Sequence, residues 1–157
     1  MMKIQGRNAV VVGMLAVLLA VGVAGTATAA EPRLVKLKAT DAMQYDVKTI
    51  QATPGESLKV TLTAVSAMSK AEMAHNFVLL AKGTNADAFA MDAAMARDNG
   101  YIPKAKTASI LAQTKFAGGG ETVEVVFNAP KEPGEYMYIC TFPGHYVGGM
   151  KGKLIVK

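Results

Sequence analysis

The segment that says most about the fold is Tyr138-Ile139-Cys140-Thr141-Phe142-Pro143-Gly144-His145-Tyr146-Val147-Gly148-Gly149-Met150. It contains a thiol, an imidazole and a thioether on Cys140, His145 and Met150, with four residues between each and the next. The Pro-Gly and Gly-Gly pairs between them are typical of tight turns. We therefore expect a compact loop, entered and left by a strand, that directs these three side chains at one point.

The types of side chain in this loop favour copper. Soft sulfur ligands combined with imidazole suit copper, and a thioether suits Cu(I) in particular. Zinc more often recruits further Cys, His or carboxylate ligands. The only other histidine, His75, stands just before the apolar run 77–80. It would complete a trigonal site of two His and one Cys with Met150 as a weak axial ligand, the arrangement described for blue-copper sites.

Outward from this loop, the pattern indicates an all-β domain. The clearest strand is 58–64, where apolar residues alternate with Lys and Thr, as in a strand with one buried face. Many short strands separated by Pro-Gly and Gly-rich turns favour a Greek-key β-sandwich. The expected strands are 34–37, 45–50, 58–64, 77–80, 107–112, 121–127, 135–140 and 153–156.

One stretch, 85–99, is predicted to be a helix outside the sheets. It is rich in Ala, Met and Asp and has no β-branched residue. Asn85 is suited to cap its start and Gly100 to end it. The face expected to pack on the sandwich is a helical stripe, and Met91 and Met95 are expected to be packing residues. That stripe consists of Ala88, Met91 and Met95.

The first 30 residues are predicted to be a secretory signal peptide. Lys3 and Arg7 precede a charge-free run of 16 residues, 9–24, and small residues lead to a cleavage site near Ala29 or Ala30. The alternative is a membrane-anchoring helix, but a spanning helix needs about 20 apolar residues. We therefore expect a mature domain of residues 31–157 in the periplasm, free of the membrane after cleavage.

Composition narrows the possible functions. An apolar fraction of 51% with 18% charged residues supports a folded core. Without Lys3 and Arg7, 15 basic residues stand against 12 acidic ones, which is too even to argue for nucleic acid as a partner. The single cysteine excludes an internal disulfide. Two histidines are too few for the second, His-rich centre of a multicopper oxidase or nitrite reductase.

The motifs resemble those of one known family. Cys140-Thr141-Phe142-Pro143-Gly144-His145, followed by Met150-Lys151-Gly152, resembles the ligand loop of azurin, and Met73-Ala74-His75-Asn76-Phe77-Val78-Leu79 resembles its first-histidine segment. Tyr101-Ile102-Pro103 and the stretch 115–121 are also similar. The sequence is identified as a member of the cupredoxins, the azurin, auracyanin and plastocyanin family of blue copper proteins. The resemblance implies a cupredoxin-like Greek-key β-sandwich or barrel with one helix outside the sheets.

The resemblance also implies a role for individual residues. His75, Cys140, His145 and Met150 would be the ligands of one type 1 copper, and the carbonyl oxygen of Ala74 would be a distant fifth group.

Two neighbours of these ligands receive roles by the same resemblance. Asn76 would tie the two ligand-bearing segments together. The backbone N–H of Phe142 would donate a hydrogen bond to the Cys140 sulfur, which withdraws charge from the thiolate and raises the reduction potential.

The sequence departs from azurin at three points. Azurin has Gly where this chain has Ala74. It has three residues between the loop His and Met, whereas four separate His145 from Met150, a spacing similar to that of auracyanin and plastocyanin. Azurin's amino-terminal disulfide is absent because Cys140 is the only cysteine. The axial distances of azurin therefore do not carry over.

The function implied is transfer of single electrons by Cu(II)/Cu(I) cycling, with His145 as the point of exchange and no enzymatic activity. The expected partners are c-type cytochromes or periplasmic oxidoreductases, and the expected state is a monomer. An alternative is a periplasmic copper-binding module for storage or delivery, which would use the same ligands but release the metal. A cysteine hydrolase would have to pair Cys140 with His145, which lie close in sequence and lack the known nucleophile signatures.

Overall fold

A computed structural model describes residues 31–157 of the chain. The predicted signal peptide, residues 1–30, lies outside the described residues. Within 31–157, no helix is both long enough and apolar enough to cross a membrane.

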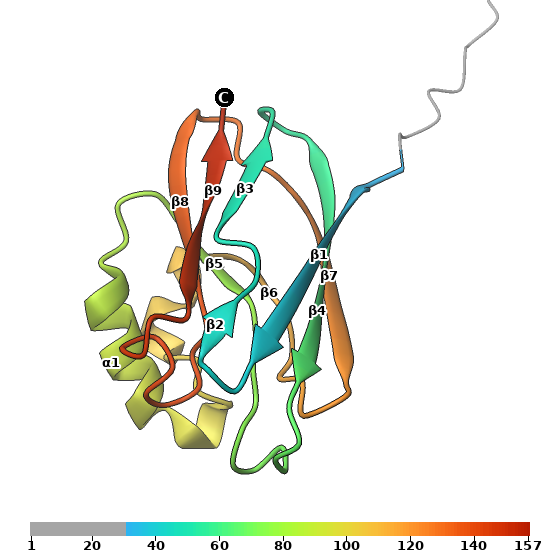
Figure 1. Ribbon diagram of the computed structural model, residues 1–157. Helices are drawn as coiled ribbons and strands as arrows, with labels where there is room; N and C mark the ends of the chain where they lie inside the picture. The colour runs from blue at the N-terminus through green and yellow to red at the C-terminus, as the bar shows by residue number, and fades with distance from the viewer. Residues whose placement is uncertain (1–30) are drawn as a thin grey trace, which may run out of the picture.

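Two β-sheets form the body of the protein (Figure 1). The four-stranded sheet has the order β2 (Gln44–Tyr45), β1 (Arg33–Thr40), β4 (Ser57–Val65) and β7 (Thr122–Asn128). The five-stranded sheet has the order β3 (Thr49–Ala52), β9 (Lys151–Val156), β8 (Gly134–Ile139), β5 (Val78–Leu80) and β6 (Ile110–Gln113). The pairs β1–β4 and β3–β9 are parallel and the others antiparallel. The prediction of a Greek-key β-sandwich is confirmed.

Two predicted strands are wrong in detail. The strand expected at 45–50 is two strands, β2 and β3, which belong to different sheets. The chain crosses from one sheet to the other at Asp46, whose carboxylate accepts hydrogen bonds from the backbone N–H groups of Lys38 and Val47. The strand expected at 107–112 begins only at Ile110, because Lys104–Ser109 forms a 3-10 helix, η2.

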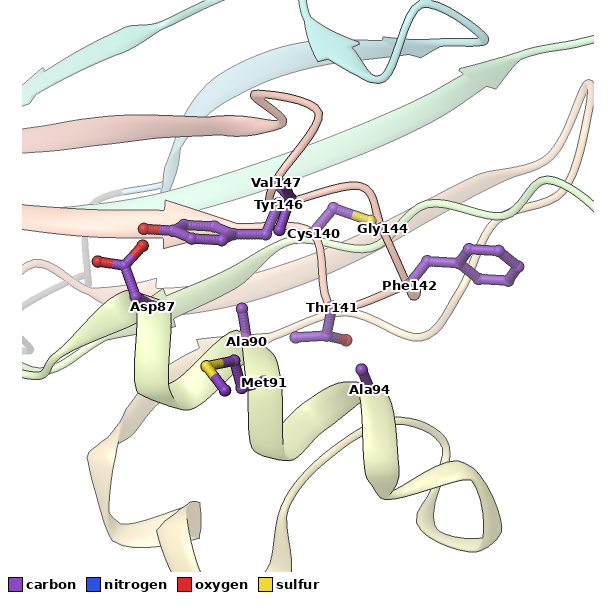
Figure 2. Close-up of a pocket in the computed structure, with 10 residues that line it drawn as sticks. All are labelled: Asp87, Ala90, Met91, Ala94, Cys140, Thr141, Phe142, Gly144, Tyr146 and Val147. Carbon is purple, nitrogen blue, oxygen red and sulfur yellow. The ribbon is translucent and has the colours of Figure 1, made fainter.

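The helix α1 spans Ala86–Met95 and is followed by a separate 3-10 turn, η1 (Arg97–Asn99). The predicted cap is present, since the Asn85 side chain accepts a hydrogen bond of 2.9 Å from a backbone N–H of the first turn. The predicted packing face is wrong. Ala86, Phe89 and Ala93 are the buried residues, whereas Met91 and Met95 are 71% and 87% exposed. Phe89 has the largest apolar surface on the helix and determines which face is buried. Met91 instead borders a groove between α1 and the loop that follows β8 (Figure 2).

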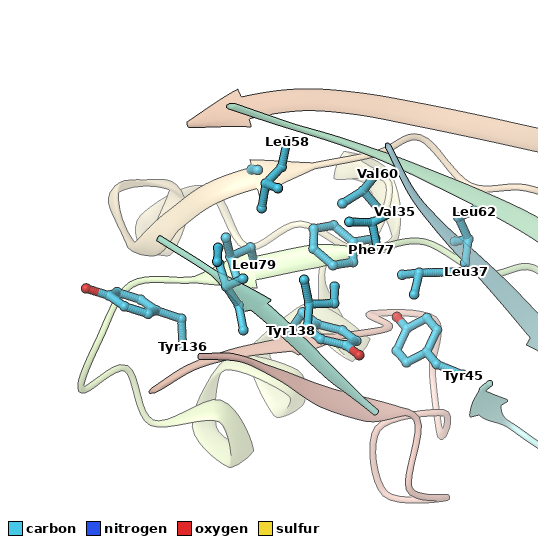
Figure 3. Close-up of a cluster of buried hydrophobic side chains, with 14 of the residues drawn as sticks. Val35, Leu37, Tyr45, Leu58, Val60, Leu62, Phe77, Leu79, Tyr136 and Tyr138 are labelled. Atoms are coloured by element: carbon cyan, nitrogen blue, oxygen red, sulfur yellow. The ribbon is translucent and has the colours of Figure 1, made fainter. Parts of the chain in front are cut away.

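The core lies between the two sheets (Figure 3). On β4, Leu58, Val60 and Leu62 are fully buried, while the residues between them reach the surface. Their side chains meet Phe77 and Tyr138 from the opposite sheet (Figure 3). Alternation of this kind is what two packed sheets require, because successive side chains of a strand point to opposite faces. The rigid sandwich thereby fixes the ends of the strands from which the candidate site is built.

Candidate metal centre

The site lies at one end of the sandwich, where three connections meet. Cys140 follows the last residue of β8, and His145 and Met150 lie on the connection from β8 to β9, residues 140–150, termed the ligand loop below. His75 comes from the connection between β4 and β5. An isolated β-bridge holds it against Ala117, with hydrogen bonds of 2.9 and 2.8 Å between their backbones. Both ligand-bearing segments therefore begin from strands or bridges that the core holds in place.

The ligand loop folds back on itself through its own backbone. The N–H of His145 donates to the carbonyl of Phe142 at 3.1 Å, and the N–H of Met150 donates to the carbonyl of His145 at 2.9 Å. The N–H of Cys140 donates to the carbonyl of Met150 at 3.2 Å, which closes the loop. Gly149 has a φ of 99°, a conformation that side-chain-bearing residues rarely adopt. The predicted compact loop is confirmed.

The structure brings three of the predicted ligands together. The ligand atoms of His75, Cys140 and His145 all lie within 4.8 Å of one another. The Cys140 sulfur is 3.4 Å from His145 Nδ1, and the two imidazole rings have centroids 4.9 Å apart. All three side chains are buried, with His145 at 3% exposure. Met150 is buried completely and stays a predicted ligand.

His75 supplies the test of whether a metal fits. Both of its ring nitrogens are buried and have no hydrogen-bond partner among the described residues. A buried polar group without a partner costs about 1–3 kcal/mol, so an unpaired imidazole at this position needs an explanation. A soft metal ion bound between His75, His145 and the Cys140 sulfur would give a buried nitrogen of His75 a partner. This set of donor atoms suits copper.

Burial keeps the thiol of Cys140 protonated in the absence of a metal. Desolvation raises the pKa of this thiol to about 12, and the backbone N–H groups of Asn76 and Phe142, which hydrogen-bond to the sulfur, partly offset the rise. The sulfur is thus surrounded by donors that stabilise the thiolate, although the pocket by itself does not ionise it. A bound cation would supply the charge that burial withholds.

Both histidines are kept in the neutral form that binds metals. Desolvation lowers the pKa of His145 to about 4, with a further contribution from the neighbouring His75. Desolvation also lowers the pKa of His75. At neutral pH the two imidazoles therefore carry free lone pairs, so no proton has to leave them before a metal binds.

Asn76 links the two segments that carry the ligands. Its side-chain N–H donates to Thr141 Oγ1 at 2.8 Å, and its side-chain oxygen accepts from the Thr141 N–H at 2.9 Å. Its carbonyl accepts a hydrogen bond of 2.5 Å from the buried Tyr45 hydroxyl. Because Asn76 and Thr141 adjoin His75 and Cys140, this pair of bonds fixes the distance between the two halves of the site.

The Ala74 carbonyl oxygen lies 4.0 Å from the Cys140 sulfur, and Ala74 directly precedes His75 in the chain. Ala74 itself is buried, at 2% exposure, so the interior of the protein accommodates its methyl group. The carbonyl oxygen is thus near the sulfur, and its role as a weak fifth group stays a prediction.

An aromatic cluster that no sequence pattern predicts lies beside His145. The Phe142 ring lies 4.7 Å from the His145 ring, and it also contacts Tyr101 at 5.7 Å and Phe116 at 5.8 Å between centroids. In the sequence, Tyr101 stands out only because Tyr101-Ile102-Pro103 is similar to azurin. No periodic pattern marks the cluster, because its three residues come from three separate connections.

The fold and the site together identify the family. The family described as copper binding proteins, plastocyanin/azurin family, matches residues 33–157. The chain belongs to this family, the cupredoxins, and the three gathered ligand residues are positioned as one type 1 copper site.

Individual relatives agree with this assignment. The chain is 39% identical to azurin from Achromobacter denitrificans over 125 residues, which is 75% of this chain and 80% of that protein. It is 45% identical to auracyanin-B from Chloroflexus aurantiacus over 83 residues, 52% of this chain. It spans only 35% of the length of auracyanin-B, and 60% of outer membrane protein H.8 from Neisseria meningitidis, to which it is 36% identical.

Solved structures show the same likeness. Reduced auracyanin from Roseiflexus castenholzii superposes with a TM-score of 0.70 and 30% identity, over 82% of this chain and 99% of that one. Auracyanin A from Chloroflexus aurantiacus, a blue copper protein, gives a TM-score of 0.69 and 32% identity over 81% of this chain and all of that one. The predicted cupredoxin-like fold is thereby confirmed.

Proposed function

We propose that this protein is a periplasmic electron carrier whose single type 1 copper is held by His75, Cys140, His145 and Met150. The observation that carries the proposal is the buried His75, whose two unpartnered nitrogens lie in the same cluster as the Cys140 sulfur and the His145 nitrogen. Residues 1–30 would direct export and be removed, which leaves the cupredoxin domain 31–157 to act in the periplasm. When bound there, copper supplies the exchange of one electron between Cu(II) and Cu(I).

The protein contributes a site that does not have to rearrange. The ligand loop is closed by its own backbone hydrogen bonds, and Asn76 fastens it to the segment of His75. Fixed ligands lower the energy needed to reorganise the site when an electron arrives or leaves. Hydrogen bonds from the N–H groups of Asn76 and Phe142 to the sulfur withdraw charge from Cys140 and favour a higher reduction potential.

His145 is the proposed point of electron exchange. It retains 3% exposure whereas His75 and Cys140 have none, and the loop around it presents Val147, which is 87% exposed. The neighbouring groove between α1 and the ligand loop is bordered by Met91 and Tyr146 (Figure 2). Such an apolar surface suits the weak, short-lived docking that an electron carrier requires. We propose c-type cytochromes or periplasmic oxidoreductases as partners of a monomeric protein.

The first experiment is an absorption spectrum of residues 31–157 with one equivalent of Cu(II), followed by ascorbate. The proposal expects an intense blue thiolate-to-copper band that bleaches on reduction and returns on reoxidation, with copper retained throughout. The band should be absent in Cys140→Ser. A colourless complex in the unchanged protein would overturn the proposal.

The methionines provide a matched pair of variants for the axial position. Met150→Leu should raise the reduction potential and alter the visible spectrum, because it replaces a weak thioether ligand with an apolar group. Met137→Leu changes another, partly buried methionine on β8 and should leave both unchanged. Equal effects of the two substitutions would show that Met150 is not a ligand.

The exchange route has its own test. His145→Gly should leave the rest of the ligand set in place but slow electron exchange with a cytochrome, and unchanged exchange with copper bound would show that the route is wrong.

Storage or delivery of copper predicts a different result, namely transfer of the metal to an acceptor faster than redox cycling. The proposal that the protein is a carrier and no enzyme expects only stoichiometric electron exchange with such partners.

A further inference from the structure

A second pocket opens beside the metal centre, apart from the groove between α1 and the ligand loop. It has a volume of about 340 Å³, and its lining includes Lys70, Ala74, Arg97, Tyr101, Phe116 and Phe142. These residues come from the connection before β5, the turn after α1, the connection after β6 and the ligand loop. The fold thus brings together four stretches that are far apart in sequence. This feature is termed the Arg97 pocket below.

The Arg97 pocket shares a wall with the metal centre. Its aromatic rings contact one another, with centroids 6.0 Å apart for Tyr101 and Phe116 and 5.8 Å apart for Phe116 and Phe142. The Phe142 ring is also 4.7 Å from the His145 ring. Phe142 also lines the groove between α1 and the ligand loop, so it stands between the two hollows (Figure 2). A group seated in the Arg97 pocket therefore lies one aromatic ring away from His145.

The backbone at Tyr101 is held in an unusual conformation. Its φ is 57°, in the left-handed region that large side chains seldom adopt, and it directly follows Gly100 with a φ of 60°. The Tyr101 N–H donates to the carbonyl of Ala96 at 2.9 Å, which secures the turn. Strained residues of this kind gather at functional sites. The Tyr101 ring that this turn carries forms part of the wall of the pocket.

The charged residues that line the Arg97 pocket are all cationic. They are Lys70 and Arg97, and no carboxylate lines it. Lys70 Nζ forms an ion pair with the Glu121 carboxylate at 2.6 Å, whereas Arg97 has no ion pair within residues 31–157. A guanidinium group binds carboxylates through two parallel hydrogen bonds and stacks well on aromatic rings. The pocket is thus complementary to an anionic group presented by a surface with some apolar character.

We propose that the Arg97 pocket docks an acidic redox protein, with a carboxylate on Arg97 and apolar contacts on Tyr101 and Phe116. This rests on the proposed electron-transfer function and names the charge of the partner. Electrons would pass between the partner and the site across the contact of Phe142 with His145. One electron moves, the reduced protein of the pair is oxidised and the other is reduced, and no covalent bond changes.

The place of binding can be tested without electron transfer. Hexacyanocobaltate(III) is a redox-inert trianion, and we would titrate it into the ¹⁵N-labelled Cu(I) protein and into the copper-free protein while recording amide NMR shifts. The largest shifts are expected at Arg97 and Tyr101 in both forms. They should be lost in Arg97→Gln and kept in Lys131→Gln, which removes an exposed lysine on the connection from β7 to β8, at the end of β8 remote from Cys140. Shifts centred elsewhere would overturn the proposal.

Rates with protein partners test the charge that is recognised. At low ionic strength, Arg97→Gln should slow electron exchange with an acidic c-type cytochrome about three- to tenfold, because steering by charge acts mainly on association. Exchange with a basic cytochrome should not slow. The difference should vanish in high salt, where the charges are screened. Lys131→Gln has the same net charge as Arg97→Gln, because each substitution removes one positive charge. Its rate of electron exchange should nevertheless equal that of the unchanged protein.

An equal fall in the rate of electron exchange in Arg97→Gln and Lys131→Gln would mean that only the net charge of the protein matters. That result would overturn the docking site. Equal slowing with both cytochromes would do the same. The blue band and its bleaching by ascorbate, recorded first for each variant, separate the two levels of inference. Absence of the band from the unchanged protein would overturn the electron-transfer function, whereas a normal band without the charge dependence would overturn only the docking site.

Discussion

Replacing Asn76 with leucine is the most direct test of how the two halves of the metal centre are held together. Leucine has the same number and branching of side-chain heavy atoms as asparagine but makes neither of the two buried side-chain bonds to Thr141, at 2.8 and 2.9 Å. Each bond contributes about 1 kcal/mol, and stranding the buried N–H of Thr141 costs about 1–3 kcal/mol more. We expect Asn76→Leu to lower the free energy of unfolding of the copper-free protein by about 3–5 kcal/mol.

The measurement is urea unfolding of the copper-free domain, so that copper binding does not add to the stability. The chain has no tryptophan, and far-UV circular dichroism with tyrosine fluorescence provides two independent probes. The matched control is Asn128→Leu at the exposed end of β7, which should change the stability by less than about 0.5 kcal/mol. Thr141→Val and the double variant complete a cycle that isolates the coupling between the Asn76 side chain and the Thr141 hydroxyl, the bond of 2.8 Å.

A loss in Asn76→Leu no larger than that in Asn128→Leu would refute the reasoning, since it would mean that the two bonds add nothing over solvation by water. A large loss that is unchanged in the background of Thr141→Val would refute the contribution of the bond to Thr141 Oγ1, because this is the bond that Thr141→Val removes while the backbone N–H of residue 141 remains. A loss of the expected size with strong coupling would establish that Asn76 fastens the ligand loop to the segment of His75.

Three further outcomes follow from the structure. Burial lowers the pKa of His145 to about 4, whereas an unfolded histidine titrates near 6.5, so the unfolded chain binds more protons between these pH values. The free energy of unfolding of the copper-free protein, measured by urea unfolding, should therefore fall by about 3 kcal/mol as the pH drops from about 6.5 to about 4. It should fall far less in His145→Gln. Gly152→Ala should destabilise the domain by about 1–3 kcal/mol in urea unfolding, because the new methyl group would overlap the buried Tyr138 ring. Asn85→Ala removes the cap of α1 and should cost about 1 kcal/mol in the same assay, whereas no loss would show that the cap is dispensable.

Chemistry local to one segment was predictable from the sequence. Cys140, His145 and Met150 lie on one short loop between Pro-Gly and Gly-Gly turns, so their convergence follows from turn propensity. The strand β4 was equally clear, because a period of two appears wherever one face of a strand is buried. In both cases the signal lies within a dozen residues and needs no knowledge of the rest of the chain.

Predictions failed where packing between distant segments decides the outcome. The run 45–50 was expected to be one strand, but a change of sheet between β2 and β3 leaves no mark on the alternation of side chains. On α1, the methionines and Phe89 define two possible apolar faces. The sandwich selects the face of Phe89, which is fully buried, because a rigid ring fills the space beside β5 and β8.

The sequence by itself determined the donor atoms and their order along the chain, because ligand chemistry belongs to residue type. Only the tertiary structure decided that the His75 ring has no hydrogen-bond partner among the described residues and lies beside Cys140. It decided as well that the Asn76 side chain hydrogen-bonds to Thr141. It also decided that Arg97 shares a pocket with an aromatic wall leading to His145. These relations join residues dozens of positions apart. Their distances are set by how two twisted sheets pack, which no local pattern of residues encodes.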